Sequence, residues 1–101
     1  FIEEHYREDI SMQDAAAALR YSDAYFCKLF KQCFKVNFSA YLNEFRVDKA
    51  QQLIRDSRLS LKDVGTAVGY SDANYFTRVF KRLTGQTPSE YRMAAVEKAV
   101  Q

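Results

Sequence analysis

The chain contains one motif twice, and this duplication limits its possible folds more than any other feature. The stretch YSDAYFCKLFKQC at residues 21–33 nearly repeats as YSDANYFTRVFKRL at residues 70–83. The copies are offset by about 49 residues, which indicates a duplicated unit and not a solenoid, because a solenoid needs at least about three repeats. Two similar structural units are therefore expected.

Each copy has the pattern of a capped amphipathic helix, predicted over residues 22–34 and 71–84. Ser22 and Ser71 are suitable N-caps, because a serine hydroxyl accepts a hydrogen bond from a free amide of the first turn. Asn74 is the one extra residue of the second copy. Apolar residues follow at helical spacing, namely Phe26, Leu29, Phe30 and Cys33 in the first copy and Phe76, Val79, Phe80 and Leu83 in the second.

The opposite face of each predicted helix is small, polar and basic. An ordinary solvated helix face mixes both signs of charge, whereas here acids occur only at the amino end, as Asp23 and Asp72. This asymmetry indicates a polyanionic partner. The residues on these faces are Ala24, Cys27, Lys28, Lys31 and Lys35 in the first copy and Asn74, Thr77, Arg78 and Lys81 in the second.

A shorter helix is predicted before each repeated one. Ser11 with Asp14 resembles a capping box, and Ser60 with Asp63 repeats it. The turn after the second short helix has Gly69, for which a left-handed conformation is easy, whereas the first has Arg20, which would adopt it at a cost of roughly 1 kcal/mol. Either the first turn is strained, or it differs from the second. Helix, short turn and helix together form a helix-turn-helix unit, whose second helix can enter a major groove.

Three further helices complete an all-α chain: residues 2–8, a long helix over residues 39–56, and a last one starting at Thr87-Pro88-Ser89-Glu90. The expected division is a first subdomain at 1–38, a linker helix at 39–57 and a second subdomain at 58–101. Arg46 lies on the apolar face of the long helix and must find a carboxylate, a carbonyl or a phosphate. An ion pair that braces the helix is favoured over DNA contact.

Composition excludes several classes of function. No apolar run approaches the roughly 18 residues of a membrane span. The single His and two Cys cannot form a zinc site, no catalytic constellation is visible, and neither a metal nor another cofactor is expected. The two unpairable cysteines fit a reducing cytoplasm. The start at Phe1 suggests a piece of a longer protein.

The net charge of +2 understates the basic character of the repeats. Residues 1–9 carry four acids against Arg7, so that the remaining residues carry +5. This excess is modest for a nucleic-acid-binding domain, and the segregation of charge on the helix faces is the stronger indication.

The second copy and its flanks, GYSDANYFTRVFKRLTGQTPSEYR at residues 69–92, resemble the signature of the AraC/XylS-type bacterial transcription regulators. The resemblance extends from Ile2 to Arg92. It implies about seven helices in two helix-turn-helix subdomains joined by a long helix. Both recognition helices would enter adjacent major-groove segments of double-stranded DNA, which such stiff pairs often bend.

The resemblance also implies roles for individual residues. Base-edge contacts are expected from Ala24, Cys27 and Lys28 in the first unit and from Ala73, Asn74, Thr77 and Arg78 in the second. Phosphate contacts are expected from Ser22, Lys31, Ser71, Lys81 and Arg82. RNA polymerase is an expected further partner, and the isolated chain is expected to be monomeric within a regulator that dimerises elsewhere. Activation and repression are not distinguished.

A protein-binding helical adaptor is the alternative interpretation. It requires exposed apolar anchors, whereas the outward helix faces supply Ala, Cys and Thr. Binding to duplex DNA would weaken steeply with salt, and adaptor binding would not.

Overall fold

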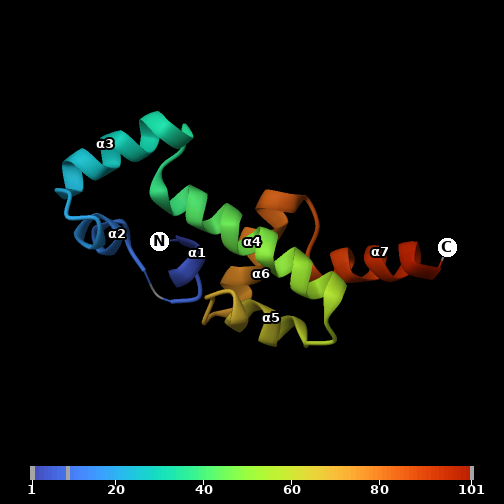
Figure 1. Cartoon of the computed structure of the whole chain (residues 1–101). Helices are drawn as coiled ribbons and strands as arrows, with labels where there is room; N and C mark the ends of the chain where they lie inside the picture. Colours follow the sequence, from blue (N-terminus) through green and yellow to red (C-terminus); the bar gives the residue numbers. More distant parts are fainter. Residues whose placement is uncertain (1, 9, 101) are drawn as a thin grey trace.

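The computed structural model describes residues 2–8 and 10–100, and in this part of the chain it forms seven α-helices and no β-strand (Figure 1). The all-α prediction with about seven helices is confirmed. The helices are α1 (Ile2–His5), α2 (Met12–Ala18), α3 (Asp23–Phe34), α4 (Phe38–Asp56), α5 (Leu61–Ala67), α6 (Ala73–Thr84) and α7 (Pro88–Val100).

The long helix α4 is the centre of an elongated molecule with extents of 50 × 23 × 21 Å. Helices α2 and α3 pack together near its amino end, and α5, α6 and α7 pack along the rest of it (Figure 1). With 19 residues and a rise of about 1.5 Å per residue, α4 spans roughly 28 Å. It separates two helix-turn-helix units, α2–α3 and α5–α6, and contacts both.

Side-chain caps set most helix starts, as the sequence predicted. The Ser11 hydroxyl accepts from the Asp14 amide at 3.2 Å, and the Asp14 carboxylate accepts from the Ser11 amide at 2.9 Å. Thr87 and Glu90 form the same reciprocal pair at the start of α7. Helix α4 begins one residue earlier than expected, at Phe38, because the side chain of Asn37 accepts from the Ala40 amide at 2.8 Å.

The turns inside the two units have the same backbone hydrogen bonds despite their different sequences. The Tyr21 amide donates to the Ala16 carbonyl at 2.8 Å, and the Tyr70 amide donates to the Gly65 carbonyl at 2.8 Å. Arg20 adopts φ 63°, where Gly69 has φ 107°. The first turn therefore copies the second and bears the strain that the sequence anticipated for Arg20.

Helix α1 is shorter than the predicted 2–8, because Arg46 binds carbonyl groups that follow it. The Nε of Arg46 donates to the Tyr6 carbonyl at 2.7 Å, and the Nη2 of Arg46 donates to the Glu8 carbonyl at 2.7 Å. The guanidinium also lies 5.2 Å from the centre of the Tyr70 ring. Arg46 is thus a buried brace between α1, α4 and the second turn, and its partners are carbonyls instead of an acid.

The core is continuous but is better sealed in the second unit. The largest fully buried side chains, Phe76, Phe80, Val64, Val68 and Val79, all come from α5, its C-cap and α6. Cys33 and Leu83, which were predicted on the apolar stripes, are exposed, and each lies in the last turn of its helix.

The described residues contain neither a helix that could span a membrane nor a cluster of metal-ligating side chains. None of their helices combines the length and apolar character needed to cross a membrane. No group of three or more His, Cys, Asp or Glu side chains in residues 2–8 and 10–100 is arranged to hold a metal ion.

Candidate nucleic-acid interface

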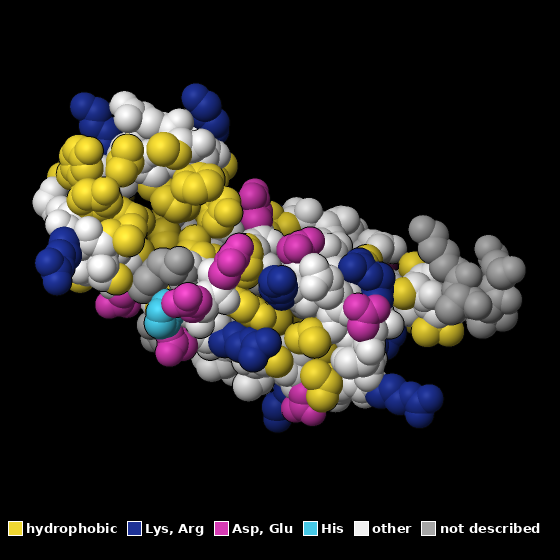
Figure 2. Space-filling view, viewed as in Figure 1, with side chains coloured by type: hydrophobic (Ala, Val, Ile, Leu, Met, Phe, Trp, Pro, Cys, Tyr) yellow, Lys and Arg dark blue, Asp and Glu magenta, His cyan; other side chains and the backbone are white. Residues whose placement is uncertain are grey.

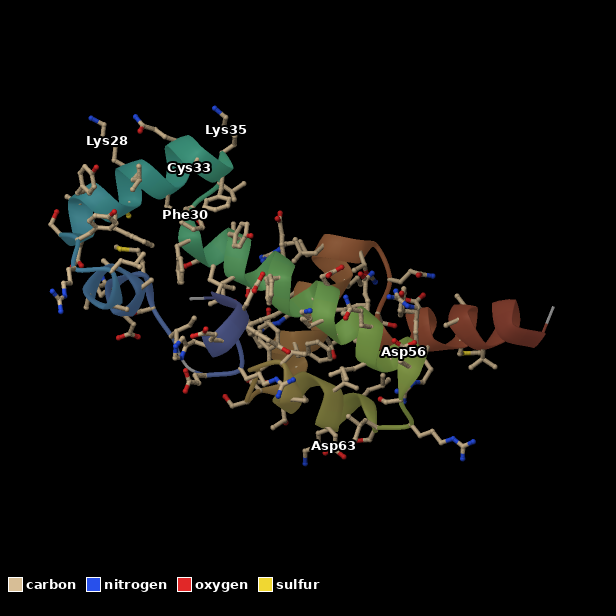
Figure 3. The ribbon with its side chains drawn as sticks, in the orientation of Figure 1. Lys28, Phe30, Cys33, Lys35, Asp56 and Asp63 are labelled. Carbon is tan, nitrogen blue, oxygen red and sulfur yellow. The ribbon has the colours of Figure 1, made fainter. Side chains whose placement is uncertain are left out.

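The predicted outward face of α3 is exposed along its whole length. Lys28 of α3 and Lys35, which is the C-cap of α3 with φ 65° and lies just outside the helix, extend away from the molecule, while Phe30 points from α3 toward α4 (Figure 3). In the described part of the chain, no acid forms an ion pair with a lysine of this face. The exposed residues predicted here are Ser22, Ala24, Cys27, Lys28, Lys31 and Lys35.

The outward face of α6 is exposed as well, and two of its side chains contact other groups of the same helix. The Thr77 hydroxyl donates to the Ala73 carbonyl at 3.0 Å, and the guanidinium of Arg78 lies 5.9 Å from the centre of the Tyr75 ring. Such a ring contact favours one orientation of the arginine. The exposed residues predicted here are Ser71, Ala73, Asn74, Thr77, Arg78, Lys81 and Arg82.

The amino ends of the two helices differ, which corrects one prediction. Ser22 caps α3 as expected and accepts from the Tyr25 amide at 3.2 Å. The predicted cap Ser71 is wrong, because the Asp72 carboxylate accepts from the Asn74 and Tyr75 amides at 2.8 and 3.2 Å and α6 begins at Ala73. A carboxylate competes well for this position, since its negative charge also favours the positive helix end.

Because the cap of α6 is Asp72 and not Ser71, the extra residue of the second copy must also be assigned to a different position. Counted from their caps, α3 and α6 have the same length, and Ala24 corresponds to Asn74. The insertion therefore lies in the turn before α6 and not at Asn74 within the helix. As a result, Cys27 with Thr77 and Lys28 with Arg78 occupy equivalent positions on the two outward faces.

Two exposed tyrosines at this interface were missed from the sequence. Neither was among the predicted site residues, but Tyr25 is 55% exposed and Tyr75 is 44% exposed. Both occupy the third position of their helix, beside the predicted base-edge residues. Their equivalent placement in both copies was the available signal.

The fold and the exposed faces together define a protein with two helix-turn-helix units, each of which presents a basic second helix. A family model described as a helix-turn-helix domain matches residues 15–94. The chain belongs to this AraC-type helix-turn-helix family, as its resemblance to the AraC/XylS-type signature implied.

Curated relatives cover nearly the whole chain. The uncharacterized HTH-type transcriptional regulator YijO of Escherichia coli is 36% identical over 92 residues, which are 91% of this chain and 32% of that protein. The regulatory protein PocR of Salmonella typhimurium is 31% identical, over 98% of this chain and 33% of that protein. The chain thus spans about a third of the length of the curated relatives it matches.

Solved structures share the whole fold. The DNA-binding domain of AdpA, a global transcriptional factor solved in complex with a target DNA, superimposes with a TM-score of 0.92 at 26% identity, covering 97% of this chain and 88% of that one. A regulator with an AraC-type DNA-binding domain from Chromobacterium violaceum gives a TM-score of 0.86 at 29% identity, covering 93% and 84%.

Proposed function

We propose that this chain binds double-stranded DNA sequence-specifically as the DNA-binding part of a bacterial transcription regulator, with α3 and α6 in adjacent major-groove segments. The observation that carries the proposal is the equivalent exposure of two basic helix faces in one chain. Membership of the family supports it, as does the neighbour solved with its target DNA. The expected subdomains at 1–38 and 58–101 and the linker at 39–57 are part of the proposal.

The bases are read by the middle of each outward face. Lys28 and Arg78 donate to guanine, Asn74 binds adenine, and Ala24 or Thr77 packs on a thymine methyl. The other base-edge positions are Cys27 and Ala73. Phosphates are bound at the amino ends near Ser22 and Ser71 and by Lys31, Lys81 and Arg82. The Asp72 carboxylate already accepts from two amides at the start of α6, whereas α3 is capped by the neutral hydroxyl of Ser22 and carries Asp23 in its first turn.

The whole regulator is proposed to act in the cytoplasm, to contact RNA polymerase and to dimerise through parts outside this chain, which by itself binds as a monomer. It is not an enzyme under this proposal.

A comparison of three variants tests the assignment of roles. Arg78→Ala should cost about 1–3 kcal/mol on the preferred duplex and relax one base position, because it removes a base contact. Lys81→Ala should weaken all sequences alike and reduce the salt dependence by roughly one unit of log-log slope. Arg58→Ala, an exposed charge in the loop between α4 and α5, is the charge-matched control and should change neither.

The measurement is equilibrium binding to a duplex selected from a random pool and to an unselected duplex, each at several salt concentrations. Equal losses for Arg78→Ala and Lys81→Ala on unselected DNA would overturn the roles. Affinity that hardly depends on salt would overturn duplex binding itself and favour the adaptor alternative.

A further inference from the structure

Two arginines and two tyrosine rings alternate through the second helix-turn-helix unit. The Arg46 guanidinium lies 5.2 Å from the centre of the Tyr70 ring, and the centres of the Tyr70 and Tyr75 rings are 5.9 Å apart. The Arg78 guanidinium lies 5.9 Å from the centre of the Tyr75 ring. This series of contacts begins in the core, where Arg46 and Tyr70 are buried, and ends on the exposed face of α6.

The buried end of the series is held by bonds to other elements. The Tyr70 ring is 5% exposed, and its hydroxyl donates to the Asn43 amide oxygen at 2.7 Å. Arg46, on the same ring, donates to the Tyr6 and Glu8 carbonyls. Tyr70 is therefore fixed in place and offers the half-exposed Tyr75 ring a firm surface to pack against.

The exposed end of the series is the arginine proposed to donate to guanine. An exposed arginine has many rotamers, and it loses this freedom when both its donors bind one base edge. A ring beside the guanidinium restricts it before binding, so that less is lost. A restricted arginine also has less freedom to reach a nearby phosphate when the base is wrong, which increases discrimination between bases.

The first unit has the tyrosine pair without the cations. The rings of Tyr21 and Tyr25 are 5.2 Å apart, but no arginine or lysine of residues 2–8 and 10–100 lies over either ring. Tyr21 lines an open apolar hollow between α2, α3 and α4, and Figure 2 shows apolar side chains gathered around it. Lys28 takes the place of Arg78, and its ammonium group has no plane to orient.

We infer that Tyr75 is a positioning residue for base recognition, whose ring, supported from the core by Tyr70, holds the Arg78 guanidinium ready for a base edge. The inference rests on the proposed function and deepens it. Tyr75 acts through Arg78 and not by a base contact of its own. The second unit consequently discriminates between bases more sharply than the first.

The test compares Tyr75→Phe, which keeps a ring, with Tyr75→Leu, which removes it. The measured quantity is the ratio of affinities for the selected duplex and for one with the base pair replaced at which Arg78→Ala relaxes specificity. Tyr75→Leu should lower this ratio about two- to fivefold, and Tyr75→Phe should retain it. In an Arg78→Ala background, Tyr75→Leu should lower the ratio no further, because no guanidinium remains to be positioned.

Tyr25→Leu is the matched control, since Tyr25 has the equivalent position in α3 and no cation over its ring. It should leave the discrimination at the base pair of Lys28 unchanged. Both tyrosines are exposed, so the variants should fold, and thermal unfolding verifies this.

Proton NMR of the DNA-free chain tests the ring contact separately. The ring current of Tyr75 should shift the side-chain protons of Arg78 upfield in the parent chain and in Tyr75→Phe, and Tyr75→Leu should abolish the shift. Unshifted Arg78 protons in the parent chain would overturn the inference and leave the proposed function intact.

Two binding results would also overturn the inference. One is an unchanged affinity ratio in Tyr75→Leu. The other is an equal loss of affinity for selected and unselected duplexes, because Tyr75 would then contact the DNA backbone itself. If the Arg78 shift responds as expected but the chain prefers no duplex sequence, the proposed function fails and the inference fails with it.

Discussion

The two helix-turn-helix units share a backbone design but differ in how completely their apolar side chains are buried. Their turns have the same hydrogen bonds, and α3 and α6 have the same length. Yet Tyr21 is 43% exposed where Tyr70 is 5% exposed. The comparison teaches that caps and turns fix the local backbone, whereas side chains from distant elements, such as Asn43 and Arg46 on Tyr70, determine how well the apolar side chains of a unit are buried.

The largest expected effect comes from two phenylalanines that differ in burial. Phe80 is 0% exposed, and Phe80→Ala should reduce the free energy of unfolding by about 3–5 kcal/mol. Phe34 is 48% exposed, so Phe34→Ala should cost less than about 1 kcal/mol. Urea unfolding of both variants measures the difference. Equal losses would show that the first unit is as well packed as the second.

The matched turn positions should respond with opposite signs. Gly69→Ala should destabilise the fold by about 2–3 kcal/mol, because residue 69 has φ 107° and an added Cβ would lie 2.6 Å from the Tyr6 carbonyl oxygen. Arg20→Gly should stabilise it by about 0.5–1 kcal/mol, since it relieves φ 63°. Thermal unfolding of both variants provides the measurement. A loss of stability in Arg20→Gly would contradict the strain assigned to the first turn.

Tyr70 gives the second unit a pH dependence at high pH. Burial raises the pKa of Tyr70 to about 12, against 10.0 for an ordinary tyrosine, although the Arg46 charge opposes this. The unfolded chain loses this proton first, so the contribution of Tyr70 to stability is full below pH 10 and should fall by about 2 kcal/mol as the pH rises to about 12.

The phenolate absorbance of the folded chain reports the same titration. It should contain one late component, which Tyr70→Phe removes. Disappearance of the late component in a Tyr21→Phe variant, with its retention in Tyr70→Phe, would reverse the comparison between the units.

Much of the fold was predictable because its determinants are local. The caps at Ser11, Ser22 and Thr87 and the left-handed turn at Gly69 are properties of a few neighbouring residues. The outward faces followed from helical spacing alone, since Lys28 and Arg78 are exposed as expected.

The predictions that were wrong depended on competition between two cap residues or on contacts between residues distant in the sequence. The choice of Asp72 over Ser71 as a cap depended on where one extra turn residue was accommodated, which periodicity within the helix does not reveal. The end of α1 depended on Arg46, which is 40 residues from Tyr6 in the sequence. The exposure of Leu19, Tyr21 and Phe34 was missed because the search for apolar anchors considered only the outward faces of the repeated helices.

The measurement that tests the central claim most directly is guanine-methylation interference on the selected duplex, with the parent chain and the Lys28→Ala and Arg78→Ala variants. The account predicts two clusters of interfering major-groove positions on one side of the duplex, roughly one helical turn of 10 base pairs apart, and each variant should lose a different cluster. A single cluster, or loss of the same cluster in both variants, would contradict the placement of α3 and α6 in neighbouring grooves.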